Sequence, residues 1–141
     1  MKTVARNILA VLAGAVVGSI VNMGLVNLGP VVVPLPEGAD VSTMERLRDS
    51  MALFSPANFL FPFLGHALGT LAGAYVAARL AASHAMKLAL VIGGLFLIGG
   101  IAAANMIGGP LWFVVTDLLV AYIPMGYMGA ILAGARRATG A

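Results

Sequence analysis

The sequence contains no cysteine, and only 9% of its 141 residues are charged. The absence of cysteine excludes disulfides, thiolate metal ligands and a cysteine nucleophile. Soluble domains usually carry about 25% charged residues, so this chain has too little charge to cover a surface that faces water. Lipid requires no such cover, and 61% of the residues are hydrophobic. We therefore expect an integral membrane protein in a lipid bilayer, forming one domain over residues 1–141.

Four long apolar segments make up most of the chain. A transmembrane helix needs about 20 apolar residues to cross the ~30 Å hydrocarbon core, and each segment is long enough. The segments are continuous apolar runs, whereas the strands of a membrane barrel alternate apolar and polar residues. The sequence therefore predicts an all-α fold, a polytopic bundle of four transmembrane helices. The predicted spans are residues 3–28, 57–80, 87–107 and 111–135.

Lysine and arginine residues predict the direction in which the spans cross the membrane. Cytoplasmic loops carry an excess of these residues, and all strongly basic segments of this chain fall on one predicted side. The loop after the first span mixes acids and bases, and the turn after the third has no charge. We therefore expect cytoplasmic N- and C-termini, a bacterial inner membrane, and no nucleic-acid binding from the net charge of +3. The basic residues are Lys2, Arg6, Arg79, Lys87, Arg136 and Arg137.

The loop between the first two spans, residues 29–55, is the longest predicted segment outside the membrane. Pro30 near its start is expected to end the first helix, because proline disrupts helix hydrogen bonding. Asp40 or Ser42 could cap a short amphipathic helix over about residues 41–54. That helix would pack on the bundle or lie in the interface, and a gate or docking surface is the functional alternative. Its apolar face would hold Met44, Leu47, Met51 and Phe54, spaced three and four residues apart.

Closely spaced glycines predict tight contacts between the spans. In lipid, small residues let helix backbones approach each other, and this close approach drives packing. The second span carries glycines at four-residue spacing on one face, so we expect it at the centre of the bundle. The same faces could instead pair copies of the chain in a homo-oligomer or join a larger membrane complex. The glycines are Gly14 and Gly18 in the first span and Gly65, Gly69 and Gly73 in the second.

Pro124 lies inside the fourth predicted span. Proline cannot donate the backbone hydrogen bond to the carbonyl of Val120, so the helix should kink or loosen there. Gly126 follows closely and adds flexibility. A hinge or gate at Pro124 and Gly126 is one interpretation, and a static kink is the other, because membrane helices tolerate proline.

Asp117 is the one formally charged residue well inside a predicted span. A carboxylate in lipid is costly, so it should face the interior and have a partner, or be protonated. His66 lies in the same half of the membrane, and we expect the two side chains to form a coupled pair. The pair could relay protons or bind a small polar solute, or it could hold the helices together by hydrogen bonds. Asn22, Thr70 and Asn105 are expected to join the cluster, and Tyr122 needs a hydroxyl partner.

Three functions fit this arrangement. The first is a proton-linked transporter or channel for a small polar solute, with the polar cluster in the outer half of the membrane. The second is a non-catalytic accessory subunit or lipid-interacting scaffold. The third is an intramembrane enzyme acting on a lipid, with His66 as base and Asp117 orienting it. The sequence shows no catalytic motif and no evident nucleophile, and two histidines are too few for a metal site, so we expect no catalytic residue, metal or cofactor.

Several short motifs run through the chain: Pro34 to Gly38, Phe61 to Thr70, Gly73-Ala74, Trp112-Phe113, Asp117, and Tyr122 to Met125. Together they resemble a group of small, uncharacterised bacterial four-helix integral membrane proteins. The resemblance covers most of the chain and implies the same four-helix membrane fold. It implies no activity, substrate or catalytic residue.

Overall fold

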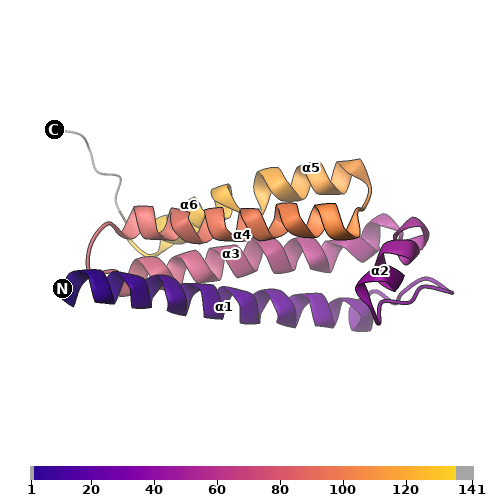
Figure 1. Cartoon of the computed structure of the whole chain (residues 1–141), viewed down its shortest axis with the longest axis horizontal. Coiled ribbons are helices and arrows are strands. Elements are labelled where there is room, and N and C mark those ends of the chain that lie inside the picture. Colours follow the sequence, from indigo (N-terminus) through magenta and orange to yellow (C-terminus); the bar gives the residue numbers. More distant parts are fainter. Residues whose placement is uncertain (1, 136–141) are drawn as a thin grey trace.

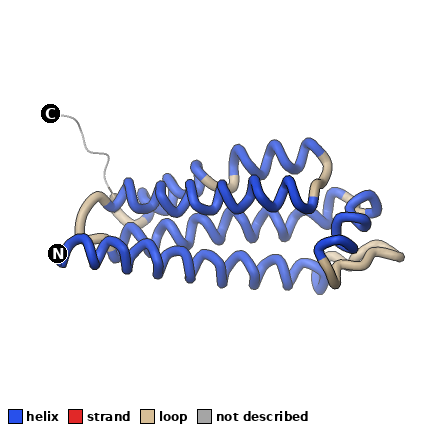
Figure 2. The backbone as a smooth tube through the Cα atoms, viewed as in Figure 1, coloured by secondary structure: helices blue, strands red, loops and turns tan. Residues whose placement is uncertain are grey.

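A computed structural model describes residues 2–135 of the chain, and within this range the fold is entirely helical. Helices account for 81% of the structure, and no strand occurs in the described range. Figure 1 shows long helices running side by side as a bundle, with the short helix α2 at one end. Figure 2 shows loops at the two ends of the bundle and at one break in the last span. Arg136 and Arg137, which contributed to the predicted orientation, lie outside the described residues.

Four helical segments of the described range are long and apolar enough to cross a membrane. The first is α1 (Lys2–Val32). The second is α3 (Leu60–Leu80), preceded directly by the 3-10 helix η2 (Pro56–Phe59). The third is α4 (Ala85–Ile107), and the fourth is divided into α5 (Leu111–Val120) and α6 (Ile123–Leu132). The four predicted spans are thus confirmed as long apolar helical segments, with their ends shifted by a few residues.

The sequence predicted that the first helix would end at Pro30. This prediction is wrong, because the helix continues to Val32. Beyond Pro30, the Val33 backbone N–H donates to the Gly29 carbonyl at 2.8 Å. Gly29 is buried against α3, where a Cβ on it would lie 2.9 Å from the Cβ of Phe61. Packing of α1 on α3 therefore holds the last turn helical although Pro30 lacks a donor, a tolerance that is common in membrane helices.

Residues 33–55, which we call the connecting segment, lie at one end of the bundle, the α2 end (Figure 1). The segment contains α2 (Met44–Ser50) and the 3-10 helix η1 (Met51–Leu53). Helical structure is therefore shorter than the predicted 41–54. Thr43, rather than Asp40 or Ser42, is the N-cap, and its hydroxyl accepts a hydrogen bond from Arg46 N at 3.2 Å. Thr43 directly precedes the first turn, so its side chain reaches a free backbone donor that the other two do not reach.

Asp40 instead holds the turn that precedes α2. Its carboxylate accepts a hydrogen bond from Ser42 N at 2.9 Å and forms an ion pair with the Arg46 guanidinium. The buried Ser50 hydroxyl donates to the Asp40 carbonyl at 3.1 Å and accepts from the Asp40 N–H at 2.8 Å. Hydrogen bonding by Ser42 and Arg46 lowers the pKa of the Asp40 carboxyl to about 2. These contacts join the turn before α2 to the first turn of the helix and to its last residue, Ser50.

The helix α3 contacts α1, α4, α5 and α6, and its glycine face lies directly on α1. A Cβ on Gly73 would lie 2.6 Å from the Gly14 carbonyl oxygen, and a Cβ on Gly69 would lie 2.8 Å from the Gly18 carbonyl oxygen. A Cβ on Gly65 would lie 2.8 Å from the amide oxygen of Asn22. No larger side chain fits at these distances without moving the helices apart. The five predicted packing glycines therefore all lie in one interface between α1 and α3.

The fourth span is interrupted at Ala121 and Tyr122, just before Pro124 in the first turn of α6. Pro124 has no N–H for the Val120 carbonyl, so the helical hydrogen bonding stops where the sequence predicted a kink. Gly126 is buried, and a Cβ on it would lie 3.3 Å from the Cα of Gly93 in α4. Gly126 thus packs α6 against α4, while the break itself lies at Ala121 and Tyr122.

Candidate functional site

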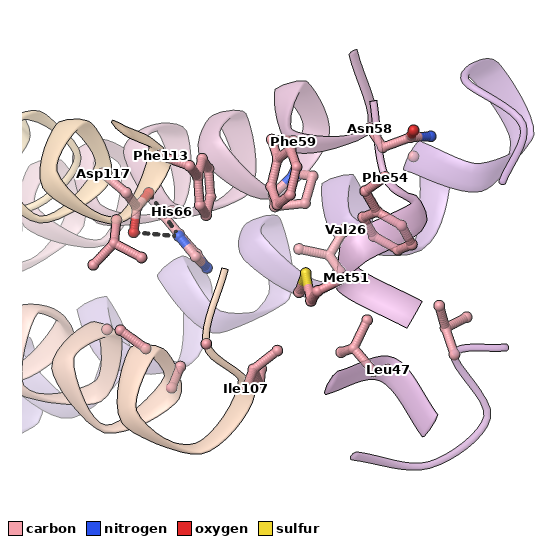
Figure 3. Close-up of a pocket in the computed structure, with 18 of the residues that line it drawn as sticks. Val26, Leu47, Met51, Phe54, Asn58, Phe59, His66, Ile107, Phe113 and Asp117 are labelled. Atoms are coloured by element: carbon pink, nitrogen blue, oxygen red, sulfur yellow. Dashed lines mark hydrogen bonds and ion pairs between the residues drawn. The ribbon is translucent and has the colours of Figure 1, made fainter. Parts of the chain in front are cut away.

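Two titratable side chains meet between α3 and α5. His66 Nδ1 lies 2.8 Å from Asp117 Oδ1 and 2.9 Å from Asp117 Oδ2 (Figure 3). Asp117 is 4% exposed, whereas the His66 side chain is 22% exposed. An ionised carboxylate only accepts hydrogen bonds, so opposite an ionised Asp117 the proton would be on Nδ1, and Nε2 would be free on the other side of the ring. The structure thus brings together the two residues that the sequence paired, and the role of the pair stays a prediction.

Tyr122 completes the cluster from the break between α5 and α6. Its hydroxyl donates to Asp117 Oδ2 at 2.9 Å, and its ring stacks on His66 with centroids 5.8 Å apart. Tyr122 is 2% exposed, so the sequence was right that its hydroxyl needs a partner, but it did not identify Asp117. The Asp117 carboxylate therefore contacts both α3, through His66, and the start of α6, through Tyr122. Both contacts suit an ionised carboxylate, which offers acceptors alone.

None of the other three polar residues expected in the cluster forms a hydrogen bond with the side chain of His66 or Asp117. Thr70 is fully buried and donates its hydroxyl to the His66 backbone carbonyl at 2.7 Å. Asn22 lies against Gly65 in the α1–α3 interface, where its buried Oδ1 has no hydrogen-bond partner. Asn105 is exposed, and its Nδ2 donates to the Ile101 carbonyl of its own helix at 2.9 Å. The similar depths predicted from the sequence therefore did not place these side chains on the same face.

A partly enclosed cavity of about 340 Å³ lies between the pair and the connecting segment. Its lining comes from α1, the connecting segment, η2, α3, α4 and α5, and most of the lining side chains are apolar. His66 and Asp117 are its only lining residues that can titrate within the described chain, and Asn27 and Asn58 are the other polar ones. The volume is near the lower end of the ~300–1,000 Å³ that is usual for small-molecule sites. The cavity is thus an apolar pocket with one polar cluster, formed by His66 and Asp117.

Aromatic rings form one wall of this cavity. Phe59 is 4% exposed and lies at the centre of the wall. Its ring centroid is 4.7 Å from that of Phe113 and 5.7 Å from that of Phe54, which also line the cavity. The ring of Trp112, 5.6 Å from Phe59 between centroids, lies outside the lining. Figure 3 shows Phe113 and Phe59 between the His66–Asp117 pair and Phe54 of the connecting segment. The predicted apolar residues Leu47, Met51 and Phe54 face this cavity, whereas Met44 is 50% exposed and does not line it.

The cavity is confined to the half of the bundle nearest α2. Its lining reaches no further than Gly100 on α4, His66 on α3 and Leu118 on α5. In the other half, small buried side chains pack around Ile92, which itself has no exposed surface. These small residues are Ala74, Ala77, Ala78, Ala89 and Ala130. The cavity therefore ends at the His66–Asp117 pair and does not continue toward the opposite end.

The site offers a base but little else for catalysis. The residues that line the cavity include no serine, threonine, tyrosine, cysteine or lysine, so none of these nucleophiles faces His66 Nε2 from the described chain. Residues 2–135 also contain no group of three or more His, Cys, Asp or Glu side chains placed to hold a metal ion. The arrangement can therefore bind a molecule and exchange a proton with it or with water.

Comparison with known proteins adds no functional assignment. No protein-family model, curated protein or solved structure matches the chain. The resemblance to small bacterial membrane proteins thus remains an expectation from the sequence motifs.

Proposed function

We propose that this is an integral protein of a bacterial inner membrane that moves a small solute in a proton-linked manner through a site in the outer half of the membrane. In this proposal both termini are cytoplasmic, and the α2 end faces outward. The positive-inside rule supports this orientation, because Lys2, Arg79 and Lys87 all lie at or near the opposite end from α2.

The observation that carries the proposal is the position of the His66 imidazole. Its Nδ1 is held by Asp117, while the side chain lines a cavity large enough for a small molecule. Protonation of Nε2 would add one positive charge at the inner end of that cavity. A solute bound there would sense this charge at short range in a medium of low dielectric constant. Solute binding and proton binding at this site are therefore linked.

Transport also requires that the packed half of the bundle open at times. The break at Ala121 and Tyr122 supplies a point where α6 can tilt relative to α5. Tyr122 lies at this break and donates its hydroxyl to Asp117, so a change at the pair would act directly on the start of α6. Because four helices barely enclose a path, the working unit in this proposal is a homo-oligomer or a larger membrane complex.

The experiment that tests the outward cavity uses the absence of cysteine in the chain. Ala103 lines the cavity, whereas its neighbour Ala102 on α4 is exposed and does not line it. The Ala103→Cys variant should react with a membrane-impermeant thiol reagent added from the outer side of membrane vesicles. The Ala102→Cys variant, which faces lipid, should react much more slowly. Equal protection of both positions, or reaction of Ala103→Cys only from the cytoplasmic side, would overturn the proposal.

A second candidate function is a non-catalytic, lipid-interacting scaffold. The observation that favours it is the apolar character of most of the cavity lining, which would also suit a lipid acyl chain. This alternative predicts that the protein, purified in mild detergent, retains a lipid detectable by native mass spectrometry. It also predicts that Asp117→Asn leaves lipid retention unchanged, since an acyl chain makes no hydrogen bond to a carboxylate.

A further inference from the structure

We propose that the cavity beside His66 and Asp117 binds an organic cation with an apolar body, such as a lipophilic amine, and that this cation competes with a proton for the pair. The inference rests on the proposed function, because it names the class of solute for the same site. Four features of the cavity support it: its charge, its aromatic wall, its apolar lining and the groups that face the pair.

The charge of the site favours a cation. Asp117 is 4% exposed, lies 2.8 Å from His66 Nδ1 and accepts a hydrogen bond from the Tyr122 hydroxyl, and both contacts suit an ionised carboxylate. With a neutral imidazole, the cluster carries one negative charge. No lysine or arginine of residues 2–135 lines the cavity to balance it. An uncompensated charge in lipid is costly, so a ligand that brings a positive charge would be stabilised there.

The aromatic wall adds a second attraction for a cation. The faces of aromatic rings carry partial negative charge and attract ammonium groups within about 6 Å. Phe113 and Phe59, whose centroids are 4.7 Å apart, both line the cavity, and Figure 3 places Phe113 next to the pair. A cation bound close to Asp117 would therefore contact an aromatic ring at the same time.

The remaining lining excludes other classes of ligand. Hard metal cations such as Ca²⁺ need six to eight oxygen ligands, whereas only three residues of the lining carry side-chain oxygens: Asn27, Asn58 and Asp117. An anion would meet the negative cluster. A molecule with an apolar body of small-molecule size fits the lining and the volume of about 340 Å³.

Competition with a proton follows from the same charges. When His66 takes a second proton on Nε2, the positive charge of the imidazolium cancels the negative charge of the Asp117 carboxylate. The attraction for a ligand cation is then lost. Tyr122 is the one other titratable group of the described chain that contacts the pair, from the start of α6. Neither α1, α4 nor the connecting segment contributes a titratable residue to the cavity lining in that range. Arg48 borders a neighbouring hollow and does not line this cavity.

The test compares three small aromatic probes of similar size: benzyltrimethylammonium, benzyl alcohol and benzenesulfonate. Binding to the full-length protein in nanodiscs is measured by calorimetry and by the fluorescence of Trp112, the single tryptophan. The ring centroid of Trp112 lies 5.6 Å from that of Phe59, which lines the cavity. At pH 8 we expect benzyltrimethylammonium to bind about tenfold more tightly than benzyl alcohol, and benzenesulfonate not to bind. The preference for the cation should fall once His66 takes up its second proton.

Two variants separate the contribution of the Asp117 charge to cation binding from that of the Phe113 ring. Asp117→Asn should abolish both the preference for the cation and its pH dependence. Phe113→Leu keeps the carboxylate, and it should weaken binding of the cation by roughly threefold to thirtyfold while changing that of benzyl alcohol less. Thr116→Val is the matched control on α5, because Thr116 is exposed and its hydroxyl bonds to the Trp112 carbonyl of its own helix. It should leave all three affinities unchanged.

The outcomes distinguish this inference from the function on which it rests. If benzyl alcohol binds as tightly as the cation in the wild-type protein, the solute class is wrong, while the cavity remains a binding site. If no probe binds although Ala103→Cys is labelled from outside, the solute class is again wrong. If no probe binds and Ala103→Cys is protected, both the inference and the proposed function fail.

Discussion

Replacing Gly73 by alanine adds one methyl group at the place where the backbones of α1 and α3 touch. The new Cβ would lie 2.6 Å from the Gly14 carbonyl oxygen and 3.3 Å from the Cα of Gly18. Ordinary contact begins at 3.4 Å, so the helices must separate by about 0.8 Å, the difference between 3.4 and 2.6 Å. The obstructing atoms belong to the backbone and cannot rotate away. Overpacking of this kind costs about 1–3 kcal/mol.

The assay is the free energy of unfolding, measured by titration with sodium dodecyl sulfate in mixed micelles. Gly94→Ala on α4 is the matched control, because a Cβ on Gly94 would meet no atom within 4 Å. Alanine favours a helix over glycine by roughly 1 kcal/mol in both variants, so the comparison cancels this gain. Gly73→Ala should therefore be less stable than Gly94→Ala by about 1–3 kcal/mol. Equal stability of the two variants would show that α1 and α3 are not in backbone contact.

Two further predictions concern the polar contacts. Tyr122→Phe removes the hydroxyl that donates to the buried Asp117 at 2.9 Å, and it should lower the free energy of unfolding by about 1.5–3 kcal/mol in the same assay. Tyr75→Phe at a 39% exposed side chain should change it by less than about 0.5 kcal/mol, and equal effects would contradict the Tyr122–Asp117 bond. The depressed pKa of Asp40 means that its contribution to the connecting segment is complete above its ordinary pKa of 3.8 and is lost as the pH falls through about 2. Hydrogen exchange at the Ser42 amide should therefore show loss of protection between these pH values, and Asp40→Asn should lack this transition; a transition unchanged in Asp40→Asn would rule out Asp40 as its source.

The spans and their central interface could be predicted from the sequence because each depends on residue type and local spacing. Twenty apolar residues define a span wherever they occur, and glycines four apart necessarily share one helix face. The end of α1 could not be predicted in this way. Pro30 disrupts hydrogen bonding locally, but the burial of Gly29 against Phe61 keeps the turn helical, and that contact depends on the tertiary packing.

The His66–Asp117 contact could be predicted from depth and from the cost of a lone acid in lipid. The contact of Tyr122 with Asp117 could not be predicted from the sequence. Residues five apart on a continuous α-helix are rotated by about 140° from each other, so Tyr122 would point away from Asp117. The break at Ala121 and Tyr122 removes that restriction and allows the hydroxyl to reach the carboxylate.

Depth alone also misplaced Asn105. The α4 residues that line the cavity are Gly100, Ala103, Ala104 and Ile107, which are spaced as one helix face. Asn105 follows Ala104 by one residue and is therefore rotated by about 100° from that face. The depth of Asn105 could be predicted from its position in the span, but its direction could not, because the direction depends on how α4 is rotated against α3.

The protonation and water exposure of the two His66 nitrogens test the proposed site most directly. Nitrogen-15 NMR with magnetisation transferred from water can be applied to histidine-labelled protein in bilayers, after His84→Asn removes the other histidine. Asparagine suits position 84 because His84 has a φ of 56°, a conformation that asparagine tolerates. We expect a protonated Nδ1 that loses its bond to the carboxylate in Asp117→Asn, and an Nε2 that receives magnetisation rapidly from water. An Nε2 that receives none, or an unprotonated Nδ1, would contradict the proposed site.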